Sequence, residues 1–338
     1  MVLLRILLFP FSILFDLITR LRNHLYEIKM KPSVNFEIPT LVLGNLIAGG
    51  SGKTPHVQYV IEQLLGKGDF GILSRGYGRK TKGFLEVKKG DTSEEVGDEP
   101  LQYKNRFGDM VQVAVGEQRI VAIPEMILNG VEGVVLDDAF QHRKLKASAY
   151  VLLTEYKRPF YNDFVLPSGL LRESRKGAER ADFIVVTKCP SENIDLKLVK
   201  NQIRKYNTDA PIAFSTYDYS DLKIVSGHEK SNVIVFSGIA NSNLFENYVV
   251  SKYEVLDSKK FGDHHSYTKG ELEKLVNLAK ERKAMLITTE KDYMRIFNNV
   301  ELEKIMKGVS FGYIPIQVRF VEGGDQFNGF VKKVFNVE

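Results

Sequence analysis

The stretch FEIPTLVLGNLIAGGSGKTPHVQYVIEQLLGKG, residues 36–68, decides the fold of this chain. It opens with an apolar run that ends in Gly-Asn, which is typical of a buried strand. Between Val57 and Leu65, apolar residues recur at the three- and four-residue spacing of a helix. The glycine-rich segment AGGSGKTP separates the two. The order strand, glycine-rich loop, helix predicts a loop that binds phosphate groups.

The loop itself has most features of a Walker A motif, because Lys53 and Thr54 directly follow Gly52. Glycines let several backbone N–H groups point at phosphate oxygens, Lys53 would hold the terminal phosphates, and the Thr54 hydroxyl would bind Mg²⁺. The standard pattern has another glycine where this chain has Ile47. The nucleotide-binding residues expected from this loop are Ile47, Ala48, Gly49, Gly50, Ser51, Gly52, Lys53 and Thr54.

Further apolar runs alternate with helical segments downstream of the loop, one of them a helix expected from about Arg119 to Leu128. This alternation predicts a parallel α/β sheet with both faces covered. The run GVVLDDAFQHR ends in Asp137 and Asp138 at a strand's carboxyl end, where ligands of α/β sheets bind. Either carboxylate could bind Mg²⁺ directly or through water. The segment TKCP has Pro190 where a guanine-reading motif has Asp, which favours ATP over GTP.

Composition excludes several classes of protein. The chain has 338 residues, which suggests two domains, and a net charge of +5. That charge excludes a polybasic nucleic-acid tail and an acidic disordered chain, so we expect no nucleic-acid partner. The single cysteine, Cys189, cannot form an internal disulfide or a cysteine-rich metal site. Nothing in the sequence indicates an obligate protein partner.

The charge is concentrated at the N-terminus, where residues 1–34 contain five basic and two acidic side chains beside the stretch MVLLRILLFPFSILFDLIT. Arg5, Pro10 and Asp16 interrupt this stretch, and no small-residue cleavage site follows it. We favour a helix that lies in the membrane interface and enters from the cytoplasmic side. A true membrane span and a helix packed on its own domain are the alternatives.

We expect three parts: the apolar and basic N-terminal helix 1–34, a P-loop nucleotide-binding domain 35–220, and a smaller C-terminal α/β domain 221–338. The second domain should contain a helix from about Lys269 to Glu281. Two polar loops, VGDEP and FGDHHSYT, could each supply a general base for an alcohol acceptor. The sequence alone does not pair them across about 165 residues, and a solvated loop is the simpler interpretation of each.

Taken in order, these segments resemble the tetraacyldisaccharide 4′-kinase family of lipid A biosynthesis. The family usually has Gly where Ala139 stands, whereas the variant spacing of the glycine-rich loop agrees with the family. The segments that carry the resemblance span most of the chain: GNLIAGGSGKTP, LSRGYGR, VGDEP, LDDAFQHR, LPSGLLRE, FSGIAN, FGDHH and TTEKD.

The resemblance implies transfer of the γ-phosphoryl group of ATP to the 4′-hydroxyl of a lipid A disaccharide 1-phosphate precursor. It implies two α/β/α domains with the nucleotide between them, and a place on the cytoplasmic face of the inner membrane of a Gram-negative-type bacterium. Asp98 would be the catalytic base, with His264 as its dyad partner and Lys53 on the phosphates. Thr54, Asp137, Asp138 and Glu99 would serve the metal. The region around substrate and phosphates would include Glu173, Arg172, Gln141, His142 and Arg119.

Two other functions stay open from the residues alone: a P-loop regulatory ATPase or GTPase, and a kinase of another membrane-borne alcohol. Because His264 falls in the second expected domain and Asp98 in the first, we also expect the domains to close to complete the dyad.

Overall fold

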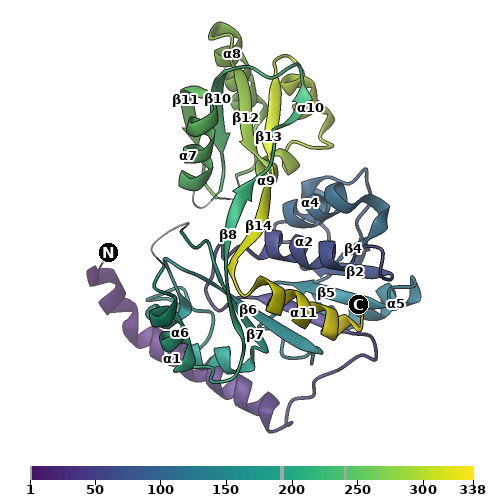
Figure 1. Ribbon diagram of the computed structural model, residues 1–338, viewed down its shortest axis with the longest axis vertical. Coiled ribbons are helices and arrows are strands. Elements are labelled where there is room, and N and C mark those ends of the chain that lie inside the picture. The colour runs from purple at the N-terminus through teal and green to yellow at the C-terminus, as the bar shows by residue number, and fades with distance from the viewer. Residues whose placement is uncertain (1, 191–193, 240–241, 264) are drawn as a thin grey trace. The chain divides into compact units, whose positions relative to one another are not determined.

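The computed structural model describes residues 2–190, 194–239, 242–263 and 265–338 (Figure 1). The chain forms two compact units. Unit 1 comprises residues 1–75, 109–217 and 318–338, and unit 2 comprises residues 76–108 and 218–317.

These units differ from the contiguous domains expected at 35–220 and 221–338. Residues 76–108 belong to unit 2, because the helix α4 (Asp98–Phe107) packs against α9 (Glu290–Met294). The C-terminal segment 318–338 belongs to unit 1, where α11 (Gly324–Phe335) packs against α2 (Lys53–Leu64) and β1 (Thr40–Gly44). In both cases, helix packing joins segments that are far apart in the sequence.

Unit 1 is built on a sheet whose central strands are parallel and fully buried. Both faces of such a sheet are covered, and each buried Val or Leu stabilises it by about 1.5–3 kcal/mol. Leu43 is paired with Asp137 in this sheet, so the carboxyl ends of β1 and β5 are neighbours. Among the described residues this sheet has nine strands, in the order β14 (Ile316–Glu322), β8 (Ile212–Tyr219), β7 (Phe183–Thr187), β6 (Ala149–Glu155), β1, β5 (Gly133–Asp137), β2 (Phe70–Ser74), β4 (Gln112–Val115) and β3 (Leu85–Glu86).

Helices cover this sheet, α2 against β1 and β5, and α5 (Arg119–Leu128) against β2 and β4. The helix expected from about Arg119 to Leu128 is therefore confirmed, and so is the parallel α/β class. The remaining elements that lie in unit 1 are α1 (Val2–Glu27), α6 (Leu196–Arg204) and the 3₁₀ turns η2 (Phe160–Asn162) and η3 (Arg175–Arg180), with η1 (Gly108–Met110) at its boundary.

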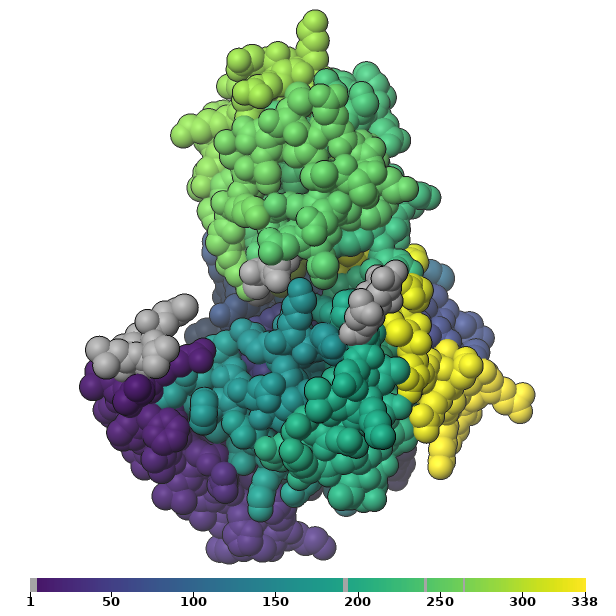
Figure 2. All heavy atoms as spheres, turned by 60° about the vertical axis from the view of Figure 1, so that its left-hand side comes forward, coloured from purple at the N-terminus to yellow at the C-terminus, as the bar shows by residue number. Residues whose placement is uncertain are grey.

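The helix α1 lies on the surface of unit 1, where Figure 2 shows it in purple. Ser12 Oγ accepts a hydrogen bond from the Ser168 backbone N–H at 2.9 Å, and Phe9 packs edge-on against Phe164. In the described part of the chain, no helix has the length and apolar character that crossing a membrane requires.

Unit 2 has its own five-stranded sheet in the order β11 (Glu254–Lys260), β10 (Asn232–Ser237), β12 (Met285–Thr289), β13 (Phe311–Ile314) and β9 (Lys223–Ser226). Only β9 is antiparallel to its neighbour. The expected helix from about Lys269 to Glu281 is confirmed as α8, which begins at a capping box formed by Thr268 and Glu271. The other elements are β3 (Leu85–Glu86), α3 (Ser93–Val96), α4, α7 (Asn243–Lys252), α9 and α10 (Val300–Met306).

Candidate active site

The glycine-rich loop connects β1 to α2, as the sequence predicts. Gly52 precedes α2 in the left-handed conformation with φ 84°, and Gly49 has φ 118°. A Cβ atom on Gly52 would lie 1.8 Å from Tyr217 Oη, so only glycine fits there. The first turn of α2 carries no acidic residue, and its N-cap has no side chain. The backbone N–H groups of this turn are therefore suited to binding a phosphate.

Side chains around the loop hold its carbonyl groups. Asn45 Nδ2 donates to the carbonyl of Ile47 at 2.6 Å, and Thr187 Oγ1 donates to the carbonyl of Ser51 at 2.9 Å. Lys188, the lysine of the TKCP segment, donates to the carbonyl of Gly50. These bonds engage oxygen atoms that would otherwise repel phosphate groups.

His56 supports the loop from within unit 1, which the sequence analysis did not predict. Its Nδ1 lies 2.7 Å from the carbonyl oxygen of Gly52, and its Nε2 lies 2.9 Å from Ser215 Oγ. Burial lowers the pKa of His56 to about 4, so the ring is neutral at pH 7. Because a carbonyl only accepts, Nδ1 carries the proton and donates to Gly52. The only sequence signal is the position of this residue, directly after GKTP.

Lys53, the first residue of α2, and Asp138, which directly follows β5, form an ion pair of 3.6 Å. Lys53 Nζ also donates to Asn45 Oδ1 at 3.3 Å, and Arg172 Nη1 donates to Asp138 Oδ1 at 2.8 Å. Burial acts to raise the pKa of Asp138, but Lys53 and Arg172 outweigh it and hold that pKa below its usual value. Asp138 is therefore an anion with two cationic partners.

Asp137 ends β5 and is buried. Ser74 Oγ donates to its Oδ2 at 3.4 Å, and the fully buried Arg119 donates to its backbone carbonyl at 3.2 Å. Arg119 also donates to the carbonyl of Gly116. Arg119 thus supports the end of β5 from the interior.

Of the four expected Mg²⁺ donors, Thr54 and Asp137 have groups that suit that ion, whereas Asp138 and Glu99 form ion pairs with cationic side chains. Ser51 Oγ is buried in the loop and has no hydrogen-bond partner among residues 2–190, 194–239, 242–263 and 265–338. Thr54 supplies a hydroxyl in the first turn of α2, and Asp137 supplies a carboxylate at the end of β5. The described residues contain no cluster of three or more metal-binding side chains. Mg²⁺ commonly uses one or two carboxylates plus phosphate oxygens and water, so this donor set fits.

Glu173 lies in the interior of unit 1, with its side chain fully buried. Its carboxylate accepts hydrogen bonds from Arg180 at 2.8 Å, Gln141 at 3.1 Å and Asn23 at 2.6 Å. Glu173 therefore ties α1 to the segment after β5. Gln141 also donates to the carbonyl of Asn45 at 2.9 Å, which links this network to the loop.

A cavity of about 220 Å³ opens between the end of α1 and the segments before α5 and after β5. His142 lies at this cavity and contacts the carbonyl of Glu117 through Nε2 at 2.9 Å. Burial, with the positive charge of Arg119, lowers the pKa of His142. The lining is mostly polar and basic: Arg22, Tyr26, Gln118, Ile120, Gln141, His142, Arg143 and Lys144.

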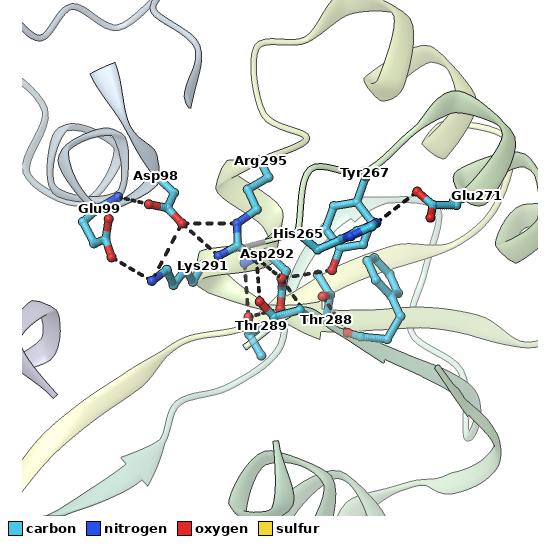
Figure 3. Close-up of polar contacts among 12 residues, drawn as sticks. Asp98, Glu99, His265, Tyr267, Glu271, Thr288, Thr289, Lys291, Asp292 and Arg295 are labelled. Carbon is cyan, nitrogen blue, oxygen red and sulfur yellow. Dashed lines mark hydrogen bonds and ion pairs between the residues drawn. The ribbon is translucent and has the colours of Figure 1, made fainter. Parts of the chain in front are cut away.

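Asp98 and Glu99 begin α4 in unit 2 (Figure 3). Gly97, which precedes them, has φ 93°, and a Cβ there would lie 3.1 Å from the carbonyl oxygen of Tyr77. The close approach of the RGYG and VGDEP segments thus sets where α4 starts.

Two cations that the sequence analysis assigned no role lie beside these carboxylates. Arg295 Nη2 is 2.9 Å from Asp98 Oδ2, and Lys291 Nζ is 2.7 Å from Glu99 Oε1 and 3.8 Å from Asp98 Oδ2. Burial and the negative charge of Asp98 raise the pKa of Glu99, against the opposing effect of Lys291. The TTEKD segment, which contains Lys291, was the one signal that could have pointed to them.

The FGDHH segment belongs to unit 2, like Asp98. His264 lies outside the described residues. His265 Nε2 contacts Glu271 Oε2 at 3.0 Å, so it supports the capping box of α8. The expected closure of two domains rested on placing Asp98 in the first domain. Because the two segments are in the same unit, bringing them together does not require that closure.

Comparisons with known proteins agree with this geometry. A family model described as Tetraacyldisaccharide-1-P 4'-kinase matches residues 4–336. A tetraacyldisaccharide 4'-kinase of Flavobacterium johnsoniae is 39% identical over 336 residues, covering 96% of each chain. One of Cytophaga hutchinsonii is 36% identical over 326 residues, covering 94% of this chain and 92% of the relative.

A solved structure has the same fold. It is the "apo" form of LpxK from Aquifex aeolicus in complex with ATP, which is 29% identical and superposes with a TM-score of 0.78 over 98% of this chain and 99% of that one. The resemblance seen in the sequence is confirmed along nearly the whole chain. This chain belongs to the tetraacyldisaccharide 4′-kinase family.

Proposed function

We propose that this chain transfers the γ-phosphoryl group of ATP to the 4′-hydroxyl of a tetraacyldisaccharide 1-phosphate. The 4′-oxygen forms a bond to the γ-phosphorus, the bond from that phosphorus to the β–γ bridging oxygen breaks, and ADP leaves. The observation that carries the proposal is a phosphate-binding loop with Lys53 paired to Asp138, in a chain that matches the family over residues 4–336.

Unit 1 would hold the nucleotide. We assign the β- and γ-phosphates to Lys53 and to the backbone of residues 47–54. Ser51, Thr54 and Asp137 would hold Mg²⁺, while Asp138 stays with Lys53 and Arg172. When bound, Mg²⁺ neutralises charge on the transferring phosphoryl group.

Unit 2 would supply the base. Asp98 is proposed to accept the proton of the 4′-hydroxyl late, as the bond to phosphorus forms. His264 is proposed as its dyad partner, orienting Asp98 or relaying the proton. In that case Asp98→Ala and His264→Ala each lower kcat, and the double variant loses less than the product of the two losses. Fully multiplicative losses contradict the dyad.

The basic cavity of unit 1 is the proposed site of the acceptor's 1-phosphate. Arg22, Arg143 and Lys144 supply positive charge around it, and the cavity volume of about 220 Å³ exceeds that of one phosphate group. Arginine and lysine are the usual protein partners of phosphate.

The helix α1 is the proposed membrane contact, on the cytoplasmic face of the inner membrane. Its apolar side chains are unusually exposed, with Leu7 70% and Leu17 63% accessible. Exposed apolar patches of this kind mark contact surfaces, and an interfacial helix buries such a face beneath the lipid headgroups. Others on α1 that share this exposure are Ile6, Phe11, Ile13, Leu14, Ile18 and Leu21.

Purified protein with γ-labelled ATP, Mg²⁺ and an acyl-disaccharide 1-phosphate in vesicles tests the function. Label in the lipid supports it, and Lys53→Ala is the control that should abolish labelling. Label found only in free phosphate contradicts it and indicates a regulatory ATPase. Label in another membrane alcohol, but not in the disaccharide, indicates a different kinase.

A further inference from the structure

The guanidinium of Arg295 joins two buried carboxylates of unit 2 (Figure 3). Its Nη2 and Nε donate to Asp98 Oδ2 at 2.9 and 3.2 Å, and its Nη1 donates to Asp292 Oδ1 at 2.6 Å and to the carbonyl of Gly238 at 2.8 Å. The side chains of Asp98 and Arg295 are 5% and 6% exposed. A charge-assisted contact this well shielded from water is much stronger than an exposed one.

Asp292 is itself held in place by three further groups. Thr289 Oγ1 donates to its Oδ2 at 2.6 Å, the Tyr267 hydroxyl donates to its Oδ1 at 2.9 Å, and the Gly238 backbone N–H donates to Oδ1 at 3.0 Å. Burial, with the negative charge of Asp292, raises the pKa of Tyr267, so its hydroxyl stays protonated and donates. The contacts form a continuous series from the end of β10 through Asp292 and Arg295 to Asp98.

We propose that Arg295 is a positioning residue for phosphoryl transfer, which fixes the carboxylate of Asp98, with Asp292 as its anchor. The inference rests on the proposed function, because it needs Asp98 to act as the base. It assigns a purpose to the segment TTEKDYMR, residues 288–295, in which Asp292 and Arg295 lie one helical turn apart.

The contacts of Asp98 within unit 2 make a specific prediction about its geometry. Lys291 Nζ lies 3.8 Å from Asp98 Oδ2, whereas Arg295 donates two hydrogen bonds to the same oxygen atom. Removing the guanidinium of Arg295 therefore removes the contacts that fix the direction of this carboxylate. A base that is misplaced by even a small distance lowers kcat.

Lysine could not replace this arginine fully. Arg295 uses three nitrogen atoms in two directions, toward Asp98 on one side and toward Asp292 and Gly238 on the other. A lysine ammonium retains the charge but is a single point on a flexible stem. Arg295→Lys should therefore recover kcat only in part.

The test compares Arg295→Met, Arg295→Lys and Asp98→Asn with the wild type by kcat and KM for lipid labelling. Arg282→Met is the matched control, an exposed arginine of the same unit just after α8. We expect Arg295→Met to lower kcat by about 10- to 100-fold, while the KM for ATP stays within about threefold of wild type. In the Asp98→Asn background the same change should cost less than about threefold in kcat.

The outcomes separate the inference from the proposed function. Full activity of Arg295→Met, or a loss of kcat that is equally large in the Asp98→Asn background, overturns the inference while Asp98 keeps its role. Wild-type kcat in Asp98→Asn overturns the role of Asp98 and the inference with it. If Arg295→Met does not fold, Arg295→Lys decides: reduced kcat with an unchanged KM for ATP supports the inference, and unchanged kcat contradicts it.

Discussion

Gly52 shows how strictly one position can be constrained in this protein. Its φ of 84° and the 1.8 Å that would separate an added Cβ from Tyr217 Oη both exclude other residues. We expect Gly52→Ala to raise the Kd for Mg-ATP at least about 10-fold, measured by calorimetry, because the loop must move.

Tyr217→Phe supplies the control for this prediction. It removes the hydroxyl and leaves Cζ, which would lie 3.1 Å from the new Cβ. The double variant should bind ATP more tightly than Gly52→Ala alone. No recovery would mean that the backbone conformation, and not the contact with Tyr217, sets the constraint.

His56 makes the stability of unit 1 depend on pH. The folded state holds its pKa at about 4, below the ordinary 6.5, so the unfolded state binds the proton more strongly. Stability is therefore complete above pH 6.5 and is lost progressively as the pH falls toward 4. A difference of this size corresponds to about 3 kcal/mol.

Denaturant unfolding of wild type and His56→Gln at pH 7 and pH 4.5 measures this pH-dependent contribution of His56 to the free energy of unfolding. The wild type should lose more stability between the two pH values than the variant, by about 2 kcal/mol or more. Equal losses would show that another group carries the acid sensitivity.

At the scale of the element, α1 contacts its own unit through polar groups and Phe9, and leaves most of its apolar side chains exposed. Asn23 and Ser12 are hydrogen-bonded to Glu173 and Ser168, and Phe9 packs against Phe164. Because Leu7, Leu14 and Leu17 make none of these contacts, they can be changed while the attachment of the helix is kept.

The variant Leu7→Ser/Leu14→Ser/Leu17→Ser should bind anionic vesicles at least about 10-fold more weakly in sedimentation, since each buried leucine contributes about 1.5–3 kcal/mol. Its apparent KM for vesicle-embedded acceptor should rise, and the Kd for ATP should not change. Leu128→Ser on α5, where the leucine is 80% exposed, is the matched control. Unchanged vesicle binding by the triple variant contradicts the membrane role of α1.

At the scale of the whole molecule, the two sets of candidate residues belong to different units. The phosphate-binding loop lies in unit 1, and Asp98 lies in unit 2. Asp98→Ala should therefore lower kcat by about 10²–10⁴-fold while the Kd for Mg-ATP stays within about twofold. Lys53→Ala should weaken ATP binding itself, and equal effects of both changes on ATP affinity would contradict this division of labour.

Much of the fold was predictable, for a physical reason that is local. The strand that ends at Gly44 and the helices Arg119–Leu128 and Lys269–Glu281 follow from hydrophobic periodicity, which reflects which face of each element is buried. The loop was predictable because a tight phosphate-binding turn needs glycine at fixed places.

The membership of residues 76–108 in unit 2 was not predictable in this way. It depends on the packing of α4 against α9, whose sequences are almost 200 residues apart. The roles of Arg295 and His56 were missed for the same reason, since each is defined by partners far away in the sequence: Asp98 for Arg295, and Ser215 for His56.

The sequence by itself determined the parallel α/β class, the glycine-rich loop between β1 and α2, and the family, because each depends on short contiguous patterns of residues. Only the tertiary structure decided how the charges pair. Asp138 lies with Lys53 and Arg172, Glu173 is enclosed by Arg180, and Asp98 is held by Arg295. Contacts of this kind depend on distance and burial in three dimensions. A sequence motif identifies an acidic residue, but it does not show whether the carboxylate faces a metal ion or an arginine.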